Sequence, residues 1–185
     1  RPQRSVASIV DLVSVVGDME PMLRRLVLDK IVIEVTASRL PIRVRGDETG
    51  LSQIVLNLVI NARDAMPGGG TVTIDLGAID LQDPIAPRLG VLPGAYAGIS
   101  VRDTGPGIPP EIQRHLFEPF FTTKSPDQGT GLGLSIVYGI VTGLGGAIEV
   151  QSEVGQGTTV TIYLPLVGDG QSSMGDGPWS TTSPL

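Results

Sequence analysis

Cysteine is absent from this chain, and histidine occurs only once, at His115. The lack of cysteine excludes disulfides and thiolate metal sites, and a single histidine excludes a metal site made of several imidazoles. No apolar run reaches the roughly 18 residues that a membrane-spanning helix needs, and no secretory signal is recognisable. Acidic residues outnumber basic ones, which gives a formal net charge of −6. Because nucleic-acid-binding faces are usually basic, this balance argues against nucleic acid as a partner.

Aromatic residues make up only 4% of the chain, whereas glycine is abundant, with 25 residues. The glycines cluster between residues 105 and 157. Such clusters indicate backbone that approaches a ligand closely, or loops that need a positive φ. A length of 185 residues and a hydrophobic content of 41% fit one globular domain with a substantial core.

The spacing of apolar residues predicts three main helices and a mixed sheet. Helices are expected at residues 8–28, 47–66 and 132–144, with Pro21 interrupting or restarting the first. Strands are expected at residues 31–35, 42–44, 71–76, 98–101, 147–151 and 158–164, the last two forming a hairpin. Residues 78–95 read as a loop, and residues 105–131 as irregular apart from a short helix at 110–116. The predicted fold class is an α/β (α+β) two-layer sandwich in which a mixed β-sheet packs under three helices.

The second helix carries a narrow polar stripe on an otherwise apolar surface. Gln53, Asn57, Asn61 and Asp64 fall within a sector about 80° wide at the helical repeat. An ordinary surface helix is polar over more of its girth, so this helix is expected to be mostly buried. Buried amides need partners, which are either neighbouring loops or a bound metal with phosphates.

A strand is expected to end at Asp103, followed by Thr104-Gly105-Pro106-Gly107. A buried carboxylate there can accept a hydrogen bond from the exocyclic amine of adenine, whereas the carbonyl of guanine would be repelled. Gly105 and Gly107 would let the backbone approach the base. The alternative is that Asp103 only caps a turn, as aspartate often does.

Two further segments favour a phosphate ligand. Residues 129–134, Gly-Thr-Gly-Leu-Gly-Leu, lead into a helix whose free N–H groups and dipole attract anions. They match neither a P-loop nor a dinucleotide fingerprint. All three phenylalanines lie at Phe117, Phe120 and Phe121, where they can anchor a lid from which Lys124 reaches the γ-phosphate. A small satellite core beneath a long loop is the alternative.

Four segments, residues 57–65, 103–107, 117–124 and 129–134, together resemble the catalytic ATP-binding domain of bacterial sensor histidine kinases. That family shares the Bergerat ATP-binding fold with gyrase-type topoisomerases, Hsp90-type chaperones and mismatch-repair ATPases. The resemblance runs from about residue 8 to residue 166. It implies a domain that binds Mg²⁺ and ATP and transfers the γ-phosphate to a histidine.

The resemblance assigns roles to individual residues. It implies that Asn61 ligates Mg²⁺ and that Asn57 stands where hydrolysing relatives carry a water-activating glutamate, which favours a kinase over an ATPase. Asn57, Asn61 and Lys124 are the expected catalytic residues. Thr158 is expected to help Asp103 hold adenine. The remaining expected ATP contacts are Arg63, Asp64, Gly105, Gly107, Ile108, Phe117, Thr122, Thr123, Gly129, Thr130, Gly131, Leu132, Gly133 and Leu134.

The expected organisation has three parts. Residues 1–8 are a linker or the end of a missing dimerisation hairpin, residues 9–166 the catalytic domain, and residues 167–185 a disordered tail. His115 lacks the helical setting of the family's phosphoacceptor, so the acceptor is expected on a separate phosphoacceptor/dimerisation domain of the same kinase.

The resemblance also implies a response regulator or receiver domain as partner and no direct membrane contact. The fragment is expected to be monomeric and cytoplasmic, within a parent protein that can be membrane-anchored and of hybrid or nitrogen-regulator type. Three alternatives stay open: a Bergerat-fold ATPase, a serine kinase of the anti-sigma-factor type, and a non-catalytic pseudokinase that serves as a binding module.

Overall fold

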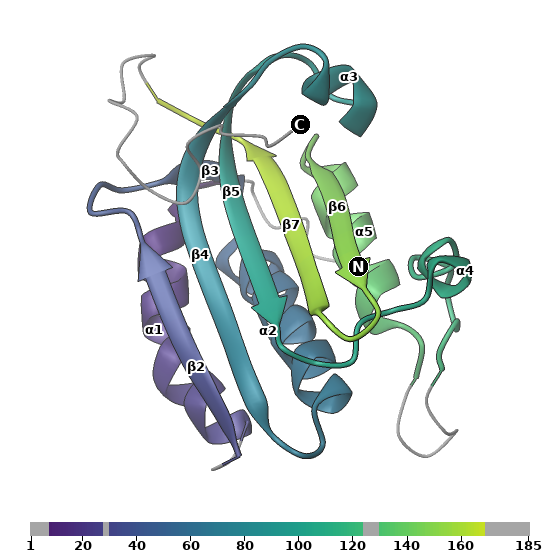
Figure 1. The fold of residues 1–185 in the computed structure, drawn as a ribbon. Coiled ribbons are helices and arrows are strands. Elements are labelled where there is room, and N and C mark those ends of the chain that lie inside the picture. The colour runs from purple at the N-terminus through teal and green to yellow at the C-terminus, as the bar shows by residue number, and fades with distance from the viewer. Residues whose placement is uncertain (1–7, 28–29, 124–129, 169–185) are drawn as a thin grey trace, which may run out of the picture.

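The computed structural model describes residues 8–27, 30–123 and 130–168. Three main helices lie on one face of a five-stranded sheet, which confirms the predicted two-layer sandwich (Figure 1). In chain order the elements are β1 (Ser8–Asp11), α1 (Leu12–Leu26), β2 (Ile31–Ala37), β3 (Arg43–Gly46), α2 (Glu48–Ala65), β4 (Gly70–Leu81), α3 (Ile85–Leu89), β5 (Gly94–Asp103), α4 (Pro110–Gln113), α5 (Gly133–Gly143), β6 (Ala147–Glu153) and β7 (Gly157–Pro165).

The large sheet is mixed and has the strand order β2-β4-β5-β7-β6. β2 runs parallel to β4, whereas β4 with β5, β5 with β7 and β7 with β6 are antiparallel pairs. β1 and β3 form a separate antiparallel pair beside it. This order places the ends of β5, β7 and β6 side by side, although β5 is distant from the other two in the sequence.

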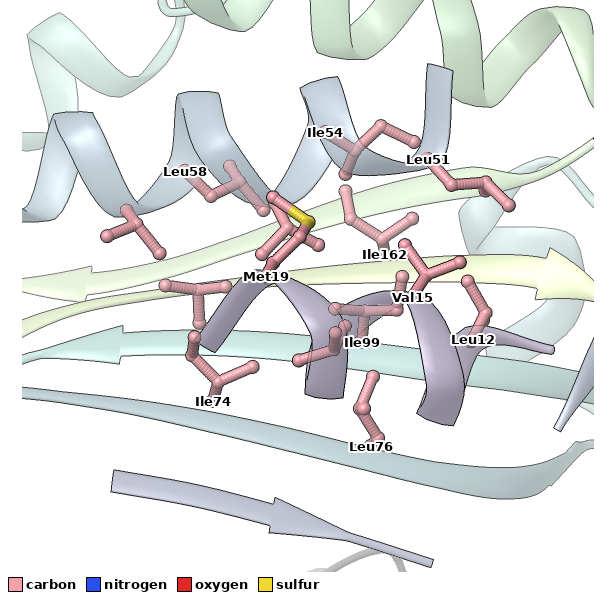
Figure 2. Close-up of a cluster of buried hydrophobic side chains, with 14 of the residues drawn as sticks. Leu12, Val15, Met19, Leu51, Ile54, Leu58, Ile74, Leu76, Ile99 and Ile162 are labelled. Atoms are coloured by element: carbon pink, nitrogen blue, oxygen red, sulfur yellow. The ribbon is translucent and has the colours of Figure 1, made fainter. Parts of the chain in front are cut away.

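The main core fills the space between the helices and one face of the sheet (Figure 2). α2 lies between α1 and α5 and packs against both. Because side chains alternate along a strand, every second residue within 72–76 of β4, 97–101 of β5 and 160–164 of β7 enters this core. The fully buried side chains include Leu12, Leu23, Leu51, Ile54, Ile74, Ile99, Ile162 and Leu164.

A second, smaller cluster lies on the opposite face of the sheet, under α3. Tyr163 stands between the core residues Ile162 and Leu164 on β7, so its side chain points away from the main core. It packs with Tyr96, Leu81, Ala86 and Ala147. The short helix α3 thus covers one end of the otherwise open face of the sheet.

The prediction of a loop at residues 78–95 is wrong. β4 continues to Leu81 and β5 begins at Gly94, and the two extensions pair with each other in register. The glycines and prolines suggested a loop, but cross-strand pairing and the cover provided by α3 keep the backbone extended. The true connection is short and contains α3 itself.

Two expectations near the N-terminus also need correction. Residues 8–11 form β1 rather than the start of a helix, because Asp11 caps α1 and the residues before it pair with β3. Pro21 lies inside α1 without interrupting it. Met19 and Leu23, on either side of this proline, are both buried and hold the helix against the core.

Only Val167 and Gly168 of the predicted tail are among the residues that the structure describes. The backbone N–H of Val167 donates to the carbonyl of Arg43 at 2.7 Å, and residues 169–185 lie outside the described residues, as do residues 1–7. Within the described ranges, no helix combines the length and apolarity that crossing a membrane requires.

Asp11 joins the small sheet to α1, which leads to a stability prediction. Its Oδ1 accepts from the N–H groups of Val13 (3.1 Å) and Ile42 (3.0 Å), and its Oδ2 accepts from the Ser14 hydroxyl at 3.0 Å. Asp11→Ala should lower the free energy of unfolding by about 2 kcal/mol, because a cap and a long-range tether are lost together. Urea denaturation measures this loss.

The matched control is Asp47, which caps α2 by accepting a hydrogen bond from the Gly50 N–H to its Oδ1 at 2.8 Å. Asp47→Ala should cost about 1 kcal/mol, the usual value for a lost cap. Equal losses in the two variants would contradict a tethering role for Asp11.

Candidate functional site

A pocket opens where β5 ends, between the C-terminal half of α2 and the start of α5. In Figure 1 this is the lower end of the sheet, where the chain leaves β5 and crosses towards α4. Its walls are mainly apolar and its polar groups few, which is typical of small-molecule sites. The lining residues are Leu58, Asn61, Ala62, Ala65, Val101, Asp103, Gly107, Ile108, Leu116, Leu134, Val150, Thr158 and Val160.

Six residues predicted from the sequence therefore meet in one pocket: Asn61, Asp103, Gly107, Ile108, Leu134 and Thr158. The apolar walls were not predicted. Leu58 and Ala65 lie about one helical turn from Asn61, and Ala62 directly follows it. Val101 and Val160 lie two residues from Asp103 and Thr158 on the same strands. The helical and strand periods around the motif residues were the signal that could have found them.

Asp103 is the last residue of β5 and is 7% exposed. Its Oδ1 accepts from the N–H of Gly105 at 2.8 Å and from the N–H of Thr158 at 3.3 Å. Burial raises the pKa of this carboxyl, and the two backbone hydrogen bonds oppose the shift. Both contacts go to Oδ1, so Oδ2 remains able to accept a hydrogen bond from a molecule in the pocket.

Close contacts within the protein require glycine at both positions after Asp103, while the predicted approach of this backbone to a base stays a prediction. A Cβ on Gly105 would lie 2.8 Å from Asp103 Oδ1, so glycine there makes room for the carboxylate. Gly107 has a φ of +73°, and a Cβ on it would lie 2.1 Å from the carbonyl oxygen of Glu153. Gly105 does not line the pocket, whereas Gly107 does.

Asn57 and Asn61 lie one turn apart on α2 and face the start of α5. A Cβ built on Gly133 would be 3.8 Å from Asn57 Oδ1 and from both terminal atoms of the Asn61 amide. The Nδ2 atoms of both asparagines are buried without a hydrogen-bond partner. Since buried amides are normally paired, these two amides fit a ligand that approaches between α2 and α5.

The start of α5 adds donors to the same place. No side chain caps this helix at Leu132, and the first turn of any helix leaves N–H groups without intrahelical partners. Together with the amides of Asn57 and Asn61, this end of the pocket suits oxygen-rich anions.

The side chains near the pocket limit which metal ion could bind there and how it would be held. Within residues 8–27, 30–123 and 130–168, no three His, Cys, Asp or Glu side chains converge on one point. A cation would therefore be held by amide oxygen together with ligand phosphates and water, a set that Mg²⁺ accepts. The residues present fit Mg²⁺ only as a companion of a phosphate ligand.

The phenylalanine segment is tied to the glycine-rich segment. The N–H of Phe120 donates to the Gly131 carbonyl at 3.0 Å. Gly131 has a φ of +67°, and a Cβ on it would lie 2.4 Å from the Phe120 carbonyl carbon. Phe120 itself has a positive φ, and its side chain is 75% exposed.

The other two phenylalanines make ring contacts outside the pocket. The Phe117 ring lies 5.5 Å from the Tyr138 ring, and the Phe121 ring lies 5.5 Å from the His115 ring. His115 also pairs with Glu118 at 2.8 Å on the surface. Two of the three phenylalanines thus pack against neighbouring rings, and the third is exposed; whether this segment acts as a lid stays a prediction.

Several predicted residues stand apart from the pocket lining. Arg63 donates to Asp64 Oδ1 through Nε at 2.9 Å and through an Nη at 2.7 Å, so the two form an ion pair on α2. Thr122 and Thr123 are exposed. Lys124 and Gly129 lie outside the described residues. The remaining predicted contacts, Thr130, Leu132 and Gly133, lie at the start of α5.

Comparison with known proteins gives consistent matches. The profile of the family described as histidine kinase-, DNA gyrase B-, and HSP90-like ATPase matches residues 46–168. Sensor kinase CckA of Brucella abortus is 43% identical over 166 residues, which are 89% of this chain and 18% of that protein. Sporulation kinase D of Bacillus subtilis is 40% identical over 126 residues, 68% of this chain and 22% of that protein. The chain thus spans about a fifth of the length of these relatives.

Solved structures agree. The mycobacterial sensor histidine kinase MprB superposes with a TM-score of 0.69 at 34% identity, over 87% of this chain and 98% of that one. Full-length ShkA, in complex with AMPPNP, superposes with a TM-score of 0.64 at 29% identity, over 90% of this chain and 33% of that one.

Because the pKa of Asp103 is raised in the folded state, the stability of the protein should depend on pH. The folded state holds the Asp103 proton more tightly than the unfolded chain, so this stabilisation is complete below the unfolded pKa of about 3.9 and is lost as the pH rises through the folded pKa. At pH 7 the ionised carboxylate lowers the free energy of unfolding. Asp103→Asn should therefore unfold at higher urea than the parent chain at pH 7, and the difference should shrink towards pH 4.

Asp80→Asn is the control. Asp80 accepts from Gln82 near the far end of β4, away from the pocket, so Asp80→Asn makes the same substitution without touching the buried carboxylate. A lower stability of Asp103→Asn at pH 7 would mean that the carboxylate contributes more to folding than its burial costs.

Proposed function

This chain belongs to the family of histidine kinase-, DNA gyrase B- and HSP90-like ATPases and matches the catalytic ATP-binding domain of sensor histidine kinases; from that premise we propose that it binds Mg-ATP and donates the γ-phosphate to a histidine of a separate phosphoacceptor domain. One observation carries the proposal. The pocket is lined by Asp103, whose Oδ2 takes neither of the two backbone hydrogen bonds, and by Asn61, whose buried amide nitrogen is unpaired beside the start of α5.

The base end suits adenine. Its exocyclic amine can donate to Asp103 Oδ2, while Val101, Val150 and Val160 supply apolar surface for the ring. A purine with a carbonyl at that position would place an acceptor against the carboxylate. We therefore expect ATP to be preferred over GTP.

The phosphate end suits a triphosphate with Mg²⁺. Asn61 would ligate the ion through its amide oxygen, and Asn57 and the first turn of α5 would donate to phosphate oxygens. When bound, Mg²⁺ would neutralise charge on the transferring phosphoryl group. Positioning and charge neutralisation are most of what this chemistry requires of the protein.

The amide side chain of Asn57 favours a kinase over an ATPase. An amide cannot take a proton from water, so Asn57 cannot act as a general base for hydrolysis. The lone pair of a neutral imidazole is already nucleophilic and needs no such base. The relatives named above are sensor and sporulation kinases, and by analogy we propose a phosphoacceptor domain and a response regulator or receiver domain as partners.

The first test is a calorimetric titration with a non-hydrolysable ATP analogue, with and without Mg²⁺, and with the matching GTP analogue as contrast. Asp103→Asn should weaken binding of the ATP analogue more than tenfold, because the acceptor for the adenine amine is replaced by a donor and a charged hydrogen bond is lost. Asp80→Asn should bind like the parent chain. Unchanged affinity in Asp103→Asn would overturn the adenine assignment.

Asn61→Ala tests the metal end. This variant should lose the Mg²⁺-dependent part of nucleotide affinity and should transfer no phosphate to an added phosphoacceptor domain in a radiolabel assay, because the only proposed protein ligand of the ion is gone. Gln53→Ala is the matched control, since Gln53 lies on the same stripe but is exposed. Full Mg²⁺ dependence in Asn61→Ala would move the metal site elsewhere.

A further inference from the structure

Three polar side chains form a row across the end of the sheet. Asp103 on β5 is the register partner of Thr158 on β7, and Thr158 is the register partner of Ser152 on β6. Directly paired residues point to the same face of a sheet. Asp103 and Thr158 line the pocket, and Ser152 stands behind Thr158 as its neighbour.

The Ser152 hydroxyl has three polar partners. It accepts a hydrogen bond from the N–H of Ile108 at 2.8 Å and donates one to the Gly157 carbonyl at 3.0 Å. It also lies 2.8 Å from the Thr158 hydroxyl. An N–H can only donate and a carbonyl can only accept. The single hydroxyl proton of Ser152 is therefore directed at Gly157.

This assignment fixes the direction of the remaining bond. With its proton committed to Gly157, Ser152 can meet Thr158 only as an acceptor, so the Thr158 hydroxyl must donate to Ser152. The Thr158 hydroxyl can then only accept a hydrogen bond from a molecule in the pocket. Next to them stands the carboxylate of Asp103, which also only accepts when ionised.

We propose that Ser152 is a positioning residue that holds the Thr158 hydroxyl as an acceptor and so sharpens the preference of the pocket for a base edge bearing an amine over one bearing a carbonyl. This inference rests on the proposed function and deepens it. Ser152 does not line the pocket itself and acts through Thr158. Without Ser152, the Thr158 proton is free to turn towards the pocket and donate to a carbonyl.

A second contact at the same place supplies a control. Gln113 on α4 donates through Nε2 to the carbonyls of Ile108 (2.7 Å) and Ser152 (3.0 Å), so it fastens the pocket loop to β6. Neither of these hydrogen bonds involves Thr158 or Asp103. Loss of Gln113 would loosen the loop without changing the direction of the Thr158 hydrogen bond.

The test compares the affinities for non-hydrolysable ATP and GTP analogues by calorimetry in Ser152→Ala, Gln113→Ala, Thr158→Val and Ser152→Ala with Thr158→Val. Ser152→Ala should reduce the ratio of ATP to GTP affinity about fivefold, the usual effect of one neutral hydrogen bond. Gln113→Ala should weaken both ligands in parallel. In the Thr158→Val background, Ser152→Ala should leave the ratio unchanged.

Ser152→Thr retains a hydroxyl and should restore the parental ratio, which separates the hydrogen bond from a general packing role, and thermal melting checks that each variant is folded. An unchanged ratio in Ser152→Ala, or an equal fall in the Thr158→Val background, would overturn the role of Ser152 while leaving ATP binding intact. If the parent chain bound neither analogue, the proposed function itself would fail, and the role of Ser152 with it.

Discussion

The structure around the end of β5 depends on the need to bury the carboxylate of Asp103. Removing an ionised group from water is costly unless hydrogen bonds replace the lost solvation, and here the backbone of Gly105 and Thr158 provides them. Gly105 must lack a Cβ for the turn to fold back on the carboxylate. Gly157, with a φ of +95°, passes so close to the Asp103 carbonyl that a Cβ would lie 2.1 Å from it. The side chain of Asp103 thus accounts for Gly105, and its backbone carbonyl accounts for Gly157.

The helix α2 contributes both to the core and to the part of the site that we propose binds phosphates. Leu58 and Ala62 are buried within the helix layer while Asn61, between them in sequence, faces Gly133 on α5. Because its neighbours are fixed by packing, the stretch of α2 that carries Asn61 is held in place before any ligand arrives. This pre-organisation leaves an amide nitrogen buried and unpaired, a cost that the core contacts of α2 offset.

Sequence patterns predicted the layers, because alternation and helical spacing report burial directly. They failed at residues 78–95, where turn-forming residues outweighed pairing partners that only the folded sheet supplies. The site likewise contains residues that the sequence could predict and residues that it could not. Asn61, Asp103 and Thr158 could be predicted because they belong to short motifs. The role of Ser152 depends on the register of three strands, and the reason for Gly107 is a contact with Glu153. Such relations between remote segments leave no local signature.

The polarity of the pocket suggests why a bound triphosphate would await an external nucleophile. On the proposed function, acceptors stand beside the base, in Asp103 and Thr158, and donors beside the phosphates, in the asparagine amides and the start of α5. A nucleoside triphosphate carries the opposite pattern, so it would fit in one orientation. Among the described residues that line the pocket, Asp103 is the only carboxylate, and on the proposed function it is occupied by the base. With amides rather than a carboxylate beside the phosphates, water gains no general base, and the γ-phosphate is kept for a nucleophile that brings its own lone pair.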